Sequence, residues 1–91
     1  MDALIEEIEE TTVGLLNGHR VPMGNMIDEA EYTLPNGTVQ TGPVCSLAIG
    51  GEVGIFVGVG SIVRVGEDRW EIIAVQISED DLGSVRLKQL P

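Results

Sequence analysis

A period-two alternation in the second half of the chain constrains its fold more than any other feature. From Val53 to Val59 every second residue is valine or isoleucine, and the residues between them are glycine or phenylalanine. Two further apolar runs follow, Ile62–Val65 and Arg69–Val75, separated by the turn residues Gly66–Asp68. Short β-branched runs punctuated by turns are typical of small sandwiches and barrels. The pattern predicts an all-β protein, a small antiparallel β-barrel or sandwich of about six or seven short strands.

The length of the chain predicts a single compact β domain over residues 1–91. The hydrophobic fraction of 43% is sufficient for a folded core, so the high charge does not indicate disorder. A domain this small has a thin margin of stability. Association with a second copy, which buries additional surface, is therefore an expected property.

The first half carries weaker signals. Residues 2–12 allow either a helix or a strand, and the pair Thr11-Thr12 followed by Gly14 favours the strand. Asn17-Gly18 and Asn36-Gly37 predict tight turns, the second of them a primed hairpin turn. Between the two turns, Pro22 and Gly24 predict an irregular stretch from Val21 to Asn25.

Residue parity predicts which side chains face the core. Met26, Ala30, Tyr32 and Leu34 are expected to face inward, as are Val63 with Val65 and Val85 with Leu87. The returning strand of the second hairpin is expected to place six residues on one face, namely Val39, Thr41, Pro43, Cys45, Leu47 and Ile49. Pro43 indicates an edge strand or a bulge. The run from Trp70 to Ile77, apolar on both faces, indicates a central strand or a bulge near Ile72-Ile73.

Charge is the strongest compositional deviation. Fifteen acidic and five basic residues give a formal net charge of −10. Such a chain repels the phosphates of nucleic acids and the surface of anionic membranes, so neither is an expected partner. A basic protein is the natural electrostatic complement. The alternative is that the charge serves only solubility.

Cys45 is the only cysteine, so no intramolecular disulfide is expected. It lies in an apolar run and is interpreted as a small buried residue rather than a nucleophile. The N-terminus is acidic, where a signal peptide requires positive charge, and no apolar run approaches the length of a membrane span. We therefore expect a cytoplasmic protein.

No residue pattern points to catalysis, a metal or a cofactor. His19 is the only histidine and is expected in an exposed loop, too isolated to build a zinc site with Asp28, Glu29 or Glu31. Glu79-Asp80-Asp81 lacks the spacing of a calcium loop and is interpreted as a solvated turn. The glycines at positions 54, 58 and 60 lie within a strand pattern and are expected to relieve crowding by Phe56 or Trp70 rather than to bind phosphate.

Trp70 with Arg69 has the composition of a partner-binding hot spot. The alternative is that Trp70 is the principal aromatic residue of the core. If the last three strands are neighbours, their cations would share one face opposite the acidic segments; these cations are Arg64, Arg69, Arg86 and Lys88. Such a dipolar surface would suit self-association.

The C-terminal half resembles the end of small, uncharacterised all-β proteins of actinobacteria. The resemblance is carried by Val57–Gly66, by Trp70–Val75 and by Val85–Leu87, which form a Gly-x-x-hydrophobic-x-Val-Gly turn, a tryptophan strand and a basic final strand. It covers less than half of the chain. What it implies is a compact bacterial barrel, with no catalytic residues to carry over.

The combined prediction is a non-enzymatic, acidic protein-interaction module that self-associates as a homodimer. The alternative is an acidic inhibitor or immunity protein that neutralises a basic enzyme. A small ligand held near Trp70 and Phe56 is a third possibility, although a short barrel is usually filled by its own side chains. The candidate partner-binding residues are Trp70, Arg69, Arg64, Arg86, Glu79, Asp80 and Asp81.

Overall fold

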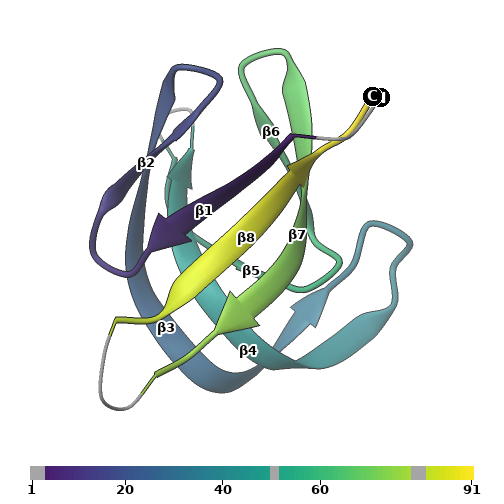
Figure 1. The fold of residues 1–91 in the computed structure, drawn as a ribbon. Coiled ribbons are helices and arrows are strands. Elements are labelled where there is room, and N and C mark those ends of the chain that lie inside the picture. The colour runs from purple at the N-terminus through teal and green to yellow at the C-terminus, as the bar shows by residue number, and fades with distance from the viewer. Residues whose placement is uncertain (1–3, 50–51, 79–81) are drawn as a thin grey trace.

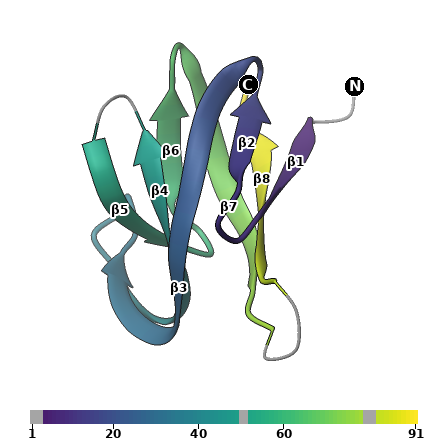
Figure 2. The same ribbon diagram turned by 90° about the vertical axis from the view of Figure 1, so that its left-hand side faces the viewer.

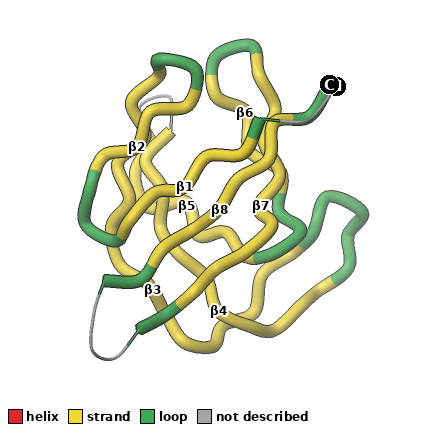
Figure 3. The backbone as a smooth tube through the Cα atoms, viewed as in Figure 1, coloured by secondary structure: helices red, strands yellow, loops and turns green. Residues whose placement is uncertain are grey.

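The structure is a computed structural model that describes residues 4–49, 52–78 and 82–91. The described residues form strands joined by turns and loops, without helix (Figure 3). This part of the chain therefore contains no helix that could span a membrane. Eight strands are present, one or two more than predicted (Figure 1). They are β1 (Ile5–Glu9), β2 (Val13–Leu16), β3 (His19–Thr33), β4 (Val39–Ile49), β5 (Glu52–Gly58), β6 (Ile62–Val65), β7 (Asp68–Gln76) and β8 (Ser84–Gln89).

The strands form two antiparallel sheets of four strands each. The first sheet has the order β1-β8-β7-β6 and the second has the order β2-β3-β4-β5. Seen from the side, β1, β7 and β8 lie in one layer, and β3, β4 and β5 lie in the other (Figure 2). The sheets are not closed into one barrel, so of the two predicted architectures the sandwich is the one that fits.

The first sheet follows the predicted alternation closely. In β8, Val85 and Leu87 are fully buried while Arg86 and Lys88 are exposed, and in β6 Val63 and Val65 are buried. Trp70 on β7 is also fully buried and is the largest side chain of the core. The inward-facing residues of this sheet pack against Leu16, Val21, Met23, Cys45, Leu47 and Val57 of the second sheet. The period-two prediction of the core is confirmed for these strands.

Strand β7 satisfies both interpretations of its apolar sequence. It is a central strand, paired with β6 on one side and β8 on the other. It also carries a register shift, because Ile72 pairs with Leu87 whereas Ala74 pairs with Arg86, which leaves Ile73 as the extra residue. In the ambiguous N-terminal segment, Ile5–Glu9 form β1, which pairs antiparallel with β8, whereas residues 10–12 form a turn. The predicted strand is therefore confirmed over Ile5–Glu9.

The second sheet is less regular because β3 contains two register shifts. Met23 pairs with Leu47 and Met26 with Cys45, so the predicted irregularity near Gly24 lies inside a continuous strand of 15 residues. The second shift lies between Ile27 and Ala30, opposite Pro43. Proline cannot donate to a ladder, so its place beside a bulge is the expected one, although β4 is a central strand.

Of the residues predicted to share one face of β4, only those in its second half reach the core. Cys45 and Leu47 are fully buried, but Val39 is 60% exposed and Thr41 is exposed as well. Strand β5 begins to pair with β4 only at Val44, so the first residues of β4 contact β3 alone. The inward face of this hairpin end therefore lies beyond the core.

The end of the β3–β4 hairpin curls toward β5 (Figure 2). Its Tyr32 hydroxyl donates a hydrogen bond of 2.8 Å to the carbonyl oxygen of Val59. The Tyr32 ring occupies the space where a Gly58 side chain would lie, and Leu34 contacts Gly60 in the same way. Gly58 and Gly60 thus relieve crowding by Tyr32 and Leu34 rather than by Phe56 or Trp70 as predicted, whereas a side chain at Gly54 would meet nothing within 4 Å.

The two Asn-Gly pairs form different turns. Asn17 and Gly18 both have positive φ, 50° and 83°, and connect β2 to β3 as a primed turn, so the predicted tight turn is confirmed. At the second pair only Gly37 has a positive φ, of 88°, and the Leu34 amide donates to the Thr38 carbonyl oxygen at 2.8 Å. The prediction of a primed turn is wrong here. The ring of Pro35 requires a negative φ at this position, which a primed turn starting there would not allow. The chain instead forms a three-residue loop between Leu34 and Thr38, and Gly37 adopts the positive φ at its end.

Candidate interaction surface

The four predicted cations lie on one face of the first sheet. Arg64 pairs with Arg69 across β6 and β7, Lys88 pairs with Glu71 across β7 and β8, and Arg86 pairs with Glu7 across β8 and β1. Directly paired residues of antiparallel strands point to the same side of a sheet. The inward side is taken by the buried residues that alternate with them, such as Trp70 and Leu87. The cations therefore share the outer face, turned away from the second sheet.

We call this surface the outer face of the first sheet. Its charged members, taken from cross-strand register and exposure, are Glu7, Glu9, Arg64, Arg69, Glu71, Arg86 and Lys88, and Ile5 and Ile62 lie among them. Ile5 is 53% and Ile62 is 41% exposed, so two branched apolar side chains lie among the charges. The surface is amphipathic, which is a common property of contact surfaces between proteins.

One ion pair lies on this face. Arg86 Nε donates to Glu7 Oε2 at 3.0 Å, and both side chains are about half exposed. Exposed pairs of this kind stabilise a fold by at most about 1 kcal/mol. Within the part of the chain that the structure describes, neither Arg64 nor Lys88 has a carboxylate within salt-bridge distance. Both therefore keep their charge available to a partner.

The other predicted partner-binding residues are not assembled with these cations. Trp70 has no exposed surface, so its side chain cannot contact a partner and the alternative interpretation, a core aromatic residue, is confirmed. Its indole Nε1 is buried and has no hydrogen-bond partner among the described residues. Glu79, Asp80 and Asp81 lie outside the described residues.

A polar cluster at one end of the sandwich has a structural explanation. Asn17 Nδ2 donates to Asp68 Oδ2 at 2.9 Å, and Gln89 Nε2 donates to Asp68 Oδ1 at 3.2 Å. The Asp68 carboxylate thus links the β2–β3 turn to β8. The β2–β3 turn and the β6–β7 turn lie side by side at the top of Figure 1. His19 is exposed and lies against Gly66. Among the described residues no three His, Cys, Asp or Glu side chains are placed to hold a metal ion.

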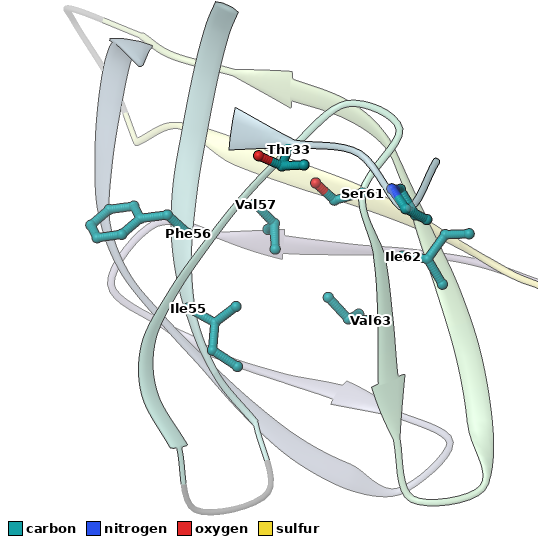
Figure 4. A pocket seen from close by; sticks show the side chains of 8 residues that line it. Thr33, Ile55, Phe56, Val57, Ser61, Ile62 and Val63 are labelled. Carbon is teal, nitrogen blue, oxygen red and sulfur yellow. The ribbon is translucent and has the colours of Figure 1, made fainter. Parts of the chain in front are cut away.

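A shallow pocket of about 320 Å³ lies between the edge strands β5 and β6 (Figure 4). Its lining residues are Thr33, Pro35, Ile55, Phe56, Val57, Ser61, Ile62 and Val63. None of these is charged, and the only side-chain polar groups are two hydroxyls. The Ser61 hydroxyl already accepts a hydrogen bond from the Gly58 amide at 3.1 Å. The pocket can hold an apolar group but offers no acid, base or thiol for catalysis.

Cys45 is fully buried in the centre of the second sheet, as predicted. Burial raises the pKa of its thiol from 9.0 to about 12, because the interior disfavours the thiolate. The thiolate is the nucleophilic form, so Cys45 is not placed to react in the folded state.

The sequence pattern predicted the shared face of the cations but not the other residues on that face. Glu71 and Ile62 belong to the same face, and parity could have placed them there once the neighbouring strands were known. The pocket could not be predicted from the sequence pattern. It brings Thr33 and Pro35 next to residues of β5 and β6, which are distant from them in the chain. The fold and this surface define a small antiparallel β-sandwich with an amphipathic, partly cationic outer face. Comparison of the chain with known protein families, with curated proteins and with solved structures gave no match.

Proposed function

We propose that this protein is a non-enzymatic interaction module that self-associates. The observation that carries the proposal is the outer face of the first sheet. It gathers four of the five cations and two exposed isoleucines in a chain whose net charge is −10. Because this face mixes its cations with Glu7, Glu9 and Glu71 while the rest of the surface is predominantly acidic, two copies repel each other least when this face meets its own copy.

Size supports the same proposal. A 91-residue domain buries a smaller share of its surface than a larger one, and association adds buried apolar area. Burial of an exposed isoleucine contributes about 1.5–3 kcal/mol when it is complete. A single buried cysteine and the acidic surface also fit a cytoplasmic location, which we include in the proposal.

The direct test is the mass of the purified protein in solution by sedimentation velocity, measured over a wide range of protein concentrations. We expect a concentration-dependent dimer. A protein that stays monomeric up to the millimolar range would contradict self-association. Turnover of generic ester, phosphate or glycoside substrates would contradict the non-enzymatic assignment, provided that the activity co-purifies with the protein.

A second candidate function is inhibition of a basic enzyme. Three exposed carboxylates, Asp28, Glu29 and Glu31, gather on β3 beside the bulge opposite Pro43 and would suit a cationic target. A pull-down at low and high salt separates the two functions. A basic protein that is captured at low salt and released at high salt would favour the inhibitor, because charge-steered contacts weaken with screening.

A further inference from the structure

We propose that two copies associate face to face through the outer face of the first sheet, about a two-fold axis that runs along the strands between β7 and β8. This inference rests on the proposed self-association and names its interface. It is carried by one row of side chains that crosses all four strands of the sheet, and the row contains Ile5, Lys88, Glu71 and Ile62.

The register fixes this row. Ile5 of β1 pairs with Lys88 of β8, Lys88 pairs with Glu71 of β7, and Glu71 pairs with Ile62 of β6. Neighbouring strands are about 4.8 Å apart, so the row spans about 14 Å across the face. Read from either end, its chemistry is apolar, charged, oppositely charged and apolar.

A two-fold axis along the strands reverses the order of the row in the second copy. Lys88 then lies opposite Glu71 of the second copy, and Glu71 lies opposite Lys88 of the second copy. Ile5 and Ile62 meet in the same reciprocal way at the two ends. Each lysine is thus flanked by two carboxylates, one from its own sheet and one from the other copy, and the row is complementary to itself.

The neighbouring rows accept the same axis. Leu90 donates its amide to the Arg69 carbonyl oxygen at 2.8 Å, so these two residues are neighbours and would exchange places. Arg86 pairs with Ala74 and would therefore face Ala74 of the second copy. Arg69 and Arg86 therefore meet apolar side chains rather than each other.

The other in-plane axis, perpendicular to the strands, is unfavourable. Where such an axis passes through the row, it keeps the order of the row and sets Lys88 opposite Lys88 and Glu71 opposite Glu71. Like charges in direct opposition cost several kcal/mol at an interface. Charge complementarity of this row therefore favours the axis along the strands over a perpendicular axis through the same row.

Charge reversal tests the arrangement. Lys88→Glu and Glu71→Lys each place two like-charged pairs across the interface. We expect each variant to lower the association constant of the dimer by more than about 10-fold. An equimolar mixture of the two variants restores both attractive pairs, since one copy then carries two carboxylates and the other two ammonium groups. We expect this mixture to form a heterodimer although each variant alone is monomeric.

Matched controls carry the same charge changes elsewhere. Arg20→Glu and Glu31→Lys alter exposed residues of β3 in the second sheet, and we expect both to dimerise as the unmodified protein does. Far-ultraviolet circular dichroism and urea unfolding check that the variants fold. If Lys88→Glu does not fold, Lys88→Gln and Glu71→Gln replace the pair, each with a smaller expected loss.

The outcomes separate the two proposals. A monomeric unmodified protein refutes self-association itself. A dimer that Lys88→Glu and Glu71→Lys leave intact keeps self-association and overturns this interface. Monomeric variants whose mixture does not associate overturn the two-fold register.

Discussion

The two sheets of this protein differ in how far each departs from a regular ladder. The first sheet has one register shift, at Ile73, and its residues alternate between the core and the outer face. The second sheet has shifts on both sides of Ile27 and another between Leu47 and Ile49, and its longest hairpin curls onto β5. The regular sheet presents a charged outer face, whereas the irregular sheet uses its bulges and glycines to fold back on itself.

This difference indicates where each sheet obtains its stability. In the first sheet, stabilisation comes mainly from the inward-facing row around Trp70 and Ile72, while its outer face remains available for contacts. In the second sheet, the hairpin end is held by close packing of Tyr32 on Gly58, well away from the central core. Substitutions in the two regions should therefore act through different mechanisms.

The largest expected effect is removal of the central aromatic residue of the first sheet. Trp70→Ala leaves a large cavity and should lower the free energy of unfolding by about 3–5 kcal/mol. Phe56→Ala in the second sheet removes a side chain that is 49% exposed and should cost about 1 kcal/mol or less. Urea denaturation followed by circular dichroism measures both. Equal costs would contradict the assignment of the core.

Alkaline pH probes the buried part of the second sheet. The pKa of the Cys45 thiol is raised from 9.0 to about 12, so the folded state favours the neutral thiol. Its contribution is fully present below pH 9 and is lost as pH rises toward 12, which amounts to about 3 kcal/mol by pH 11. Between pH 7 and pH 11, Cys45→Ala should therefore lose less stability than the unmodified protein. Identical pH profiles would mean that the β4 bulge admits water to the thiol.

The close approach of Tyr32 to Gly58 can be tested by adding one methyl group. Gly58→Ala should destabilise the fold by about 1–3 kcal/mol, because the Tyr32 ring occupies the space of the new side chain. The same substitution in a Tyr32→Ala background should cost much less. Gly42→Ala is the matched control on β4, since nothing lies within 4 Å of the added Cβ. A similar cost for both glycines would indicate a backbone effect instead of the tyrosine contact.

The smallest effect separates the two Asn-Gly turns. Asn17→Ala places alanine at a φ of 50° and removes the hydrogen bond to Asp68, so we expect a loss of about 1–2 kcal/mol. Asn36→Ala removes only the hydrogen bond that its Oδ1 accepts from the Thr38 amide, and should cost about 0.5–1 kcal/mol. Thermal unfolding of the two variants, with Asn17→Gly to isolate the φ effect, decides the order. The reverse order would contradict the turn assignments.

Sequence patterns predicted the first sheet better than the second. The inward positions Val63, Val65, Val85 and Leu87, and the bulge near Ile72-Ile73, follow from parity and from a run that is apolar on both faces. The exposure of Val39 could not be predicted in this way, because parity states which side a residue faces but not whether another strand covers that side. The same limit applies to the candidate site. Parity grouped the cations, but Trp70 beside Arg69 belongs to the buried side of its strand.

Local sequence alone determined the all-β class, the first Asn-Gly hairpin and the alternation that sets cations outside and valines inside. These properties depend on residues that are close together in the chain, through the two-residue period of a strand and the φ preferences of Asn and Gly. Tertiary structure decided the rest: two separate sheets, Tyr32 held to Val59 across 27 residues, and a row that brings Ile5 into line with Ile62. Strand neighbours and register result from the packing of the whole core, so no single segment of the chain contains them.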